Sequence, residues 1–276
     1  AYEIRLSLVG SEMCIRDSFL HGIDNGWQHE PRVRLKVRHL DHFEERTEQD
    51  WPIPRTRWTP MHLDPAASSL ASAAPAGAVT ATFDALGDGL TLLGAPLPEA
   101  TEITGPSAVK LWVSSSTTDA DLFVVMRVFA PDGEEVTFQG AIDPHTPIAQ
   151  GWLRASHRRL DAALSQPWRP YHTHDRLEPL EPGVPVELDI ELWPTCLVVP
   201  AGHRIALTIR GRDYEYPKAS GARLSNFKNE LRGCGPFLHD DPRDRPREVF
   251  GGRTTLHIGP QHPAWLLLPV IPPHAG

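Results

Sequence analysis

Apolar and polar residues alternate along much of this chain with a period of two. Between positions 185 and 193, Val186, Leu188, Ile190 and Leu192 alternate with acidic residues. That period is typical of a β-strand with one buried face and one solvated face. Residues 108–115 ("AVKLWVSS") and 204–211 ("RIALTIRG") repeat it. The chain therefore contains a predicted series of half-buried strands.

Residues 121–140 predict a β-hairpin. The run "DLFVVMRVF" is apolar at successive positions, "PDG" follows it at 131–133, and a second strand follows the turn. Pro, Asp and Gly favour tight turns. Because both faces of the first strand are apolar, we expect it to lie inside a stack of layers. Further strands are predicted at 32–39, 56–63, 79–83, 90–95, 152–160, 253–258 and 265–271.

The chain contains 28 prolines and 21 glycines, and most of them fall between these apolar runs. They would interrupt helices but suit the turns of a many-stranded protein. The pattern predicts an all-β fold, a jelly-roll β-sandwich. Residues 63–78, rich in small side chains, are predicted to form a surface loop. Residues 211–252 are predicted to form a long irregular loop that is functional or contacts a neighbouring domain.

The N-terminal residues do not follow the strand pattern. Residues 1–18 have no useful period and resemble a translated adapter, so we interpret them as a non-native segment. The alternative is a genuine strand at 4–9. "FLHG" at 19–22 predicts the end of a helix, closed by Gly22 in the left-handed conformation and followed by a turn at 23–27. The body of that helix is expected upstream.

Composition narrows the function classes. The chain has 276 residues, is 40% apolar and carries a formal net charge of −8 without a long basic run, which favours a globular protein and argues against nucleic-acid binding. No apolar stretch approaches the roughly 20 residues of a membrane span. The sparse cysteines (Cys14, Cys196, Cys234) fit a reducing compartment, and no signal peptide is evident. We therefore expect a cytoplasmic location.

Common catalytic motifs are absent from the sequence. It contains no G-x-S-x-G, no P-loop, no H-E-x-x-H and no C-x-x-C. These motifs would carry a serine nucleophile, a phosphate site, a zinc site and a redox or metal site, respectively. No catalytic residue and no cofactor is therefore predicted from motifs.

One segment has the spacing of metal ligands. His172, His174 and Glu178 would lie on the same side of a strand, an arrangement that resembles the metal motif of cupins. Gln166 and Pro185, however, stand where that pattern has glycines. We favour histidines that face solvent or a domain interface, and a cupin-like metal protein stays as an alternative.

Two further features leave a ligand-binding alternative open. Asp119 and Asp121 precede a strand, where carboxylates could hold Ca²⁺ but more often cap a turn. Scattered tryptophans could form a platform for sugars, or fill the core and an interface. They are Trp51, Trp58, Trp152, Trp168 and Trp193.

A series of segments resembles a known family in the same order. The chain is similar, over about residues 19–272, to the C-terminal half of the Xaa-Pro dipeptidyl-peptidase and CocE/NonD hydrolases. The segments are "FLHGIDNGW", "EPRVRLKVRH", "RTRWTPMHL", "TDADLFVVMRVFAPDG", "GWLRASHRRLD", "PLEPGVPVELDIELWPT", "PAGHRIALTIRGRDY", "GPFLHDDPRDRP" and "LLLPVIP".

The resemblance implies an enzyme with an α/β-hydrolase core, a helical cap and a galactose-binding-like jelly roll, which cleaves esters or amides by acyl transfer at a Ser–Asp–His triad. It implies that residues 19–30 end the hydrolase domain and that residues 31–276 form the jelly roll. The triad histidine would lie on a loop before the helix, so His21 is not expected to be catalytic. The chain alone is expected to be inactive.

The resemblance also implies partners. These are the chain's own upstream hydrolase domain and an acyl ester or peptide substrate, while a homodimer is left open. Candidates for the domain contact or the wall of the substrate cleft are Trp168, Tyr171, His172, His174 and Tyr214. The alternative is a stand-alone carbohydrate-binding module of the same jelly-roll fold, for which an exposed row of aromatic side chains on one sheet face would be evidence.

Overall fold

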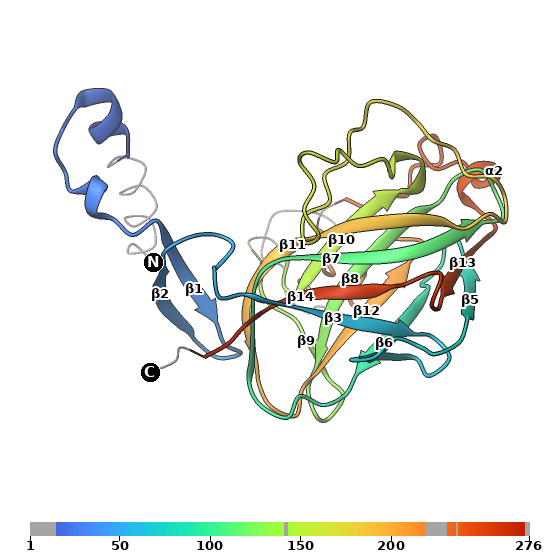
Figure 1. Ribbon diagram of the computed structural model, residues 1–276, viewed down its shortest axis with the longest axis horizontal. Coiled ribbons are helices and arrows are strands. Elements are labelled where there is room, and N and C mark those ends of the chain that lie inside the picture. The colour runs from blue at the N-terminus through green and yellow to red at the C-terminus, as the bar shows by residue number, and fades with distance from the viewer. Residues whose placement is uncertain (1–14, 141–142, 219–230, 236, 274–276) are drawn as a thin grey trace.

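The computed structural model describes residues 15–140, 143–218, 231–235 and 237–273, and it consists mainly of β-strands (Figure 1). Within these ranges the helical elements are residues 15–21, η1 (Trp27–His29), η2 (Ala155–His157) and α2 (Arg247–Phe250). The strands are β1 (Val33–Arg38), β2 (Phe43–Glu48), β3 (Arg57–Asp64), β4 (Ser69–Ala71), β5 (Val79–Asp84), β6 (Leu90–Gly94), β7 (Thr101–Ser115), β8 (Asp121–Phe129), β9 (Glu135–Val136), β10 (Ala149–Arg154), β11 (Val186–Val199), β12 (Arg204–Arg210), β13 (Arg253–Ile258) and β14 (Trp265–Ile271).

The strands form one strongly curled sheet in the order β10-β8-β12-β6-β4-β3-β14-β7-β11-β1-β2, with β13 on β7 and β5, and β9 on β8. Most neighbours are antiparallel, and β7 and β11 share a long ladder in which Leu111 lies opposite Leu188. Figure 1 shows β11, β7, β14 and β3 crossing in front of β10, β8, β12 and β6. The two halves of the curled sheet therefore face each other as the layers of a β-sandwich, as the sequence predicts.

The core lies between these two layers. In β11, Leu188, Ile190 and Leu192 are fully buried, as the alternation predicts. In β8 the prediction of burial on both faces is also confirmed, because Val124 and Phe123, which point to opposite faces, are both buried. Each such side chain contributes roughly 1.5–3 kcal/mol when it leaves water, so the alternating strands account for much of the stability.

The curled sheet closes where β10 lies against β11. At this seam a side chain on Gly151 would collide with the backbone, since an added Cβ would lie 2.0 Å from the carbonyl oxygen of Glu191. Beside it, the rings of Trp152 and Trp193 meet edge to face with centroids 5.1 Å apart. A residue without a side chain and a pair of large rings therefore join the two layers here.

Three elements differ from the sequence prediction. The segment 63–78 is not only a surface loop, because Ser69–Ala71 form β4 and Leu70 inserts into the core. Strand β2 was not predicted because its sequence, "FEERTE", is mostly polar; it pairs with β1 and is largely exposed. The strand predicted at 152–160 is shorter than expected: β10 ends at Arg154, and the chain then forms η2.

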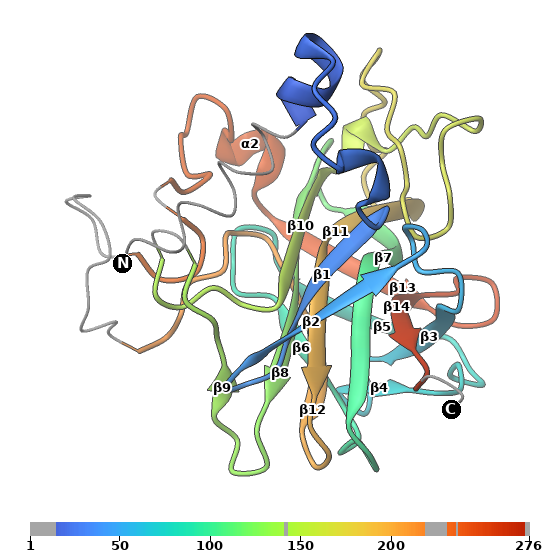
Figure 2. The same ribbon diagram turned by 90° about the vertical axis from the view of Figure 1, so that its left-hand side faces the viewer.

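The N-terminal helix ends as predicted. It covers residues 15–21, and Gly22 has a φ of +66° in the left-handed region. The helix crosses the boundary expected at residue 18, and the origin of residues 1–18 stays a prediction. The alternative strand at 4–9 lies outside the described residues. Figure 2 shows the helix above the β1–β2 hairpin, which crosses in front of β11. Within the described ranges, helices are all too short or too polar to cross a membrane.

Candidate functional site

A cavity of about 300 Å³ lies beside the start of β8 and the end of β10. Five separate parts of the chain line it: residues 121–123, residues 152–154, His157 of η2, His174, and the stretch 239–245 with His239, Asp244 and Arg245. The last two belong to the long irregular segments 155–185 and 211–252. The structure thus brings the loop that the sequence singles out and the "HTHD" segment to one place.

The cavity has an apolar floor and a polar rim. Leu122, Phe123 and Leu153 of the floor are all more than nine-tenths buried. At the rim, the Nδ1 atoms of His157 and His174 lie 3.0 Å apart, so one imidazole donates a hydrogen bond to the other. This arrangement can receive an apolar group and offer it imidazoles at the edge.

A third imidazole is held by a carboxylate. Nδ1 of His239 lies 2.9 Å from one oxygen of Asp213, and the backbone N–H of His239 donates to the other oxygen at 2.6 Å. Asp213 is 5% exposed, so it fixes both the ring and the loop from below. The pairing joins residues 26 apart in an irregular segment, and the sequence alone carries no periodic signal for it.

The wall of the cavity contains a buried ion-pair network. Asp121 binds the Nε atoms of both Arg154 and Arg245 at 2.8 Å. Arg245 also donates to the backbone oxygens of His239 and Gly211, each at 2.6 Å. The hydrogen bond to Asp121 raises the pKa of Arg154. The network fastens the loop at 239–245 to the end of the sheet.

This network argues against Ca²⁺ binding at Asp119 and Asp121. Two guanidinium groups already neutralise Asp121, and Oδ1 of Asp119 accepts the backbone N–H groups of Ala120 and Ser156, both at 2.9 Å. Asp119 therefore acts as the turn cap that the sequence offers as the other interpretation.

The prediction of a cupin-like arrangement of His172, His174 and Glu178 is also wrong. His172 makes only an isolated bridge to Leu160, and His174 has a φ of +50°, so the two histidines do not share a strand face. Glu178 forms ion pairs with Arg158 and Arg176 at 3.7 and 2.7 Å. The strand on which the ligand spacing depended does not exist.

The remaining candidates differ in exposure. Tyr171 is 41% exposed on the segment that carries His174. Trp168 stacks on Trp58 with ring centroids 4.6 Å apart. Tyr214 is only 1% exposed, and burial raises the pKa of its hydroxyl. Tyr214 therefore packs inside the 211–252 segment, and its role at a domain contact stays a prediction.

The tryptophans do not form a row. Trp58 with Trp168, and Trp152 with Trp193, pack as two separate pairs. Trp193 nevertheless leaves 62% of its surface exposed beside the cavity. The arrangement gives no support to an aromatic sugar platform and leaves an apolar surface at the seam.

His172 predicts a pH dependence of stability. Burial is the main cause that lowers its pKa below the ordinary 6.5. Between the lowered pKa and 6.5 the unfolded chain binds more protons, so the free energy of unfolding should fall as the pH falls through this window. Urea unfolding of wild type and His172→Asn at pH 7.5 and 5.5 measures the effect. The variant should lose less stability on acidification, and equal losses would contradict this assignment.

The lining of the cavity is rich in imidazoles and charged groups. Among its lining residues, all within the described part of the chain, are three histidines and several charged groups, but no serine, threonine, cysteine or lysine. The serine nucleophile of a Ser–Asp–His triad is therefore not among these lining residues. The lining can therefore bind polar groups and hold or move a proton.

Comparison with known proteins relates the chain to a non-catalytic domain of hydrolases. Residues 25–266 match the family described as the X-Pro dipeptidyl-peptidase C-terminal non-catalytic domain. A protein of Mycobacterium bovis, whose name assigns it provisionally to the serine esterases, is 36% identical over 154 residues, or 54% of this chain and 21% of its own length. The cocaine esterase of a Rhodococcus species is 24% identical over 92% of this chain and 44% of its own length.

Solved structures share the fold. A CocE/NonD family hydrolase from Staphylococcus aureus has a TM-score of 0.77 at 23% identity, covering 95% of this chain and 46% of its own. An α-amino acid ester hydrolase has a TM-score of 0.59 at 17% identity, covering 93% of this chain and 44% of its own. The chain spans less than half the length of each of these relatives.

Proposed function

Since the chain belongs to the family of X-Pro dipeptidyl-peptidase C-terminal non-catalytic domains, we propose that it is the accessory β-sandwich of a serine hydrolase of the CocE/NonD or Xaa-Pro dipeptidyl-peptidase type. The α/β-hydrolase domain of that enzyme would carry the triad and cleave an ester or amide by acyl transfer. The β-sandwich packs on it and walls part of the substrate cleft. The chain alone does not turn over acyl substrates.

One observation carries the proposal: the two long irregular segments 155–185 and 211–252 meet at the cavity, and each exposes large apolar side chains. Phe237 is 78% exposed, next to Leu238 at 43%, and Leu177 on the other segment is 62% exposed. Large apolar side chains exposed on segments that share a cavity suit an interaction surface. Domain junctions also commonly contain substrate pockets, which fits the position of the cavity.

The chemistry of the cavity suits an acyl group. Its floor of Leu122, Phe123 and Leu153 can hold an apolar acyl chain or side chain, and its rim of imidazoles can hydrogen-bond to an ester or peptide group. The Asp121 network keeps the loop at 239–245 in place, so the wall is ready before a substrate arrives.

Replacing Phe237 by serine tests the contact. In the isolated chain the change should alter stability by less than about 0.5 kcal/mol, because the ring is exposed. In the chain joined to its hydrolase domain, burial of the ring would make the same change cost about 1–3 kcal/mol of interface energy. Hydrogen exchange of residues 237–245 in both forms measures the docking. Equal exchange with and without the hydrolase domain would contradict the proposal.

The coding sequence upstream of residue 19 provides a second test. It should encode a G-x-S-x-G elbow and, later, a histidine on a loop before the helix that reaches residue 21. An upstream sequence without a hydrolase domain would favour the stand-alone module instead.

A further inference from the structure

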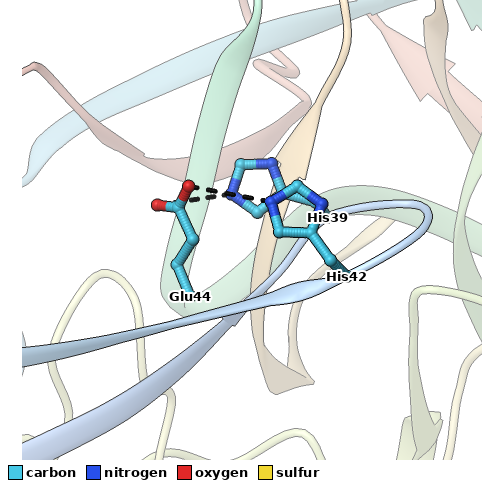
Figure 3. A group of neighbouring side chains, drawn as sticks. All are labelled: His39, His42 and Glu44. Carbon is cyan, nitrogen blue, oxygen red and sulfur yellow. Dashed lines mark ion pairs between the residues drawn. The ribbon is translucent and has the colours of Figure 1, made fainter.

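Three potential metal ligands meet at the turn between β1 and β2. Nε2 of His39 lies 3.7 Å from one oxygen of Glu44, and Nε2 of His42 lies 3.7 Å from the other oxygen (Figure 3). One ligand atom from each of the three residues lies within 4.8 Å of those of the other two. Within the described ranges, this is the only group of three such side chains that is close enough to share an ion.

The backbone of the hairpin explains why they meet. The N–H of His39 donates to the carbonyl oxygen of His42 at 2.8 Å, so these residues face each other across a two-residue turn. His42 and Glu44 are two apart and therefore point to the same face of the strand. The cluster is thus a direct product of the hairpin register, in which Arg38 lies opposite Phe43.

The spacing of these atoms fits a metal better than it fits direct hydrogen bonds. At 3.7 Å, the two nitrogen–oxygen distances are too long for a hydrogen bond. Tetrahedral zinc, with bonds to nitrogen and oxygen of about 2.0–2.1 Å, holds its ligand atoms about 3.3–3.4 Å apart. A contraction of a few tenths of an ångström would bring each imidazole and the carboxylate to that distance.

His39 and Asp41 add two further observations. Nε2 of His39 is buried but has no hydrogen-bond partner in the described part of the chain. Nδ1 of His42 lies 2.7 Å from a carboxylate oxygen of Asp41. A carboxylate on the second ring nitrogen is the usual support of a metal-bound histidine, since it sets the tautomer and orients the ring. Nε2 of His39 is therefore free of hydrogen bonds to the described residues, and the contact with Asp41 leaves Nε2 of His42 as the nitrogen available to a metal.

We propose that His39, His42 and Glu44 form a Zn²⁺ site that clamps the β1–β2 turn, with the fourth position open to solvent. The two imidazoles favour zinc over calcium or magnesium, which take mainly oxygen ligands, and zinc also accepts a carboxylate as the third ligand. The two rings stack with planes 10° apart, so one of them must turn for both nitrogens to face one ion. His42, whose side chain is 52% exposed, has the room to do so.

Isothermal titration of the 276-residue chain with zinc chloride tests the site. We expect one Zn²⁺ per chain, at least tenfold weaker binding in His39→Ala and in His42→Ala, and no comparable binding of Ca²⁺ or Mg²⁺. Glu44→Gln keeps the shape of the exposed side chain and should also weaken binding at least tenfold. Asp41→Asn should weaken it about 10-fold, the lower end of the range for such supporting residues.

The second pair of neighbouring histidines provides the matched control. His174→Ala removes one of two imidazoles whose Nδ1 atoms lie 3.0 Å apart, and it should leave zinc binding unchanged. Zinc should also raise the melting temperature of wild type and of His174→Ala but not of Glu44→Gln. No binding by wild type, or binding that survives in Glu44→Gln and His42→Ala and is lost in His174→Ala, would overturn the proposal.

Discussion

Replacing Asp121 by alanine should lower the free energy of unfolding by about 3–5 kcal/mol. The side chains of Asp121 and Arg245 are 9% and 6% exposed, and the change would leave the buried guanidinium of Arg245 without its carboxylate. Removing one partner of a buried pair costs more than the pair contributes, because the other charge stays out of water. Urea unfolding monitored by circular dichroism measures the loss.

Asp244 provides a matched control for this change. It pairs with Arg154 at 3.1 Å, but its side chain is 62% exposed. An exposed ion pair contributes only about 0–1 kcal/mol, so Asp244→Asn should have little effect. If the Asp121 and Asp244 variants were equally stable, the buried network would not be what holds the loop to the sheet.

The Asp121 change should also affect the cavity. Arg245 binds the backbone oxygens of His239 and Gly211, so its displacement would release the loop that forms one side of the site. Hydrogen exchange of residues 237–245 should therefore become faster in Asp121→Ala and stay unchanged in Asp244→Asn. Stability and the shape of the cavity wall depend on the same carboxylate.

The strands were predictable because their signal is local. The alternation of Leu188, Ile190 and Leu192 with acidic residues requires only one buried face, and all three are fully buried. Strand β2 escaped prediction for the opposite reason: it is held by pairing with β1 and buries little, so its polar sequence carries no period. Leu70 escaped because one leucine among small residues gives no repeat, although it packs in the core.

The site was predictable only as segments. The length of 211–252 and the histidines of "HTHD" indicated where to look, but not that His174 and Asp244 line one cavity. The decisive contacts, such as that of Asp213 with His239, join distant positions in irregular backbone. Such backbone has neither the period of a strand nor that of a helix, so the sequence does not show which residues will meet. The burial of Tyr214 could not be predicted either, because one aromatic residue in an irregular loop gives no sign of whether it points inward.

Substituting alanine for Gly151 should lower the free energy of unfolding by about 3 kcal/mol, near the upper end for overpacking. The added Cβ would lie 2.0 Å from the carbonyl oxygen of Glu191 and 3.3 Å from Cα of Leu192, so a rigid backbone, not a flexible side chain, opposes it. Relief requires β10 and β11 to separate, which would also part Trp152 from Trp193. The urea midpoint measures the loss of stability, and tryptophan fluorescence reports the separation of the two rings.

Gly77→Ala is the control for Gly151→Ala, because it replaces a glycine by alanine without a steric clash. An added Cβ at Gly77 meets nothing within 4 Å, and its φ lies outside the left-handed region, as does that of Gly151. Gly77→Ala should therefore be neutral or stabilise the chain by up to about 1 kcal/mol, because it reduces the freedom of the unfolded state. A Gly151→Ala variant as stable as Gly77→Ala would mean that β10 and β11 can part without cost. The sandwich would then not close at this seam, and the cavity beside it would lose the fixed wall on which the proposed contact with a hydrolase domain depends.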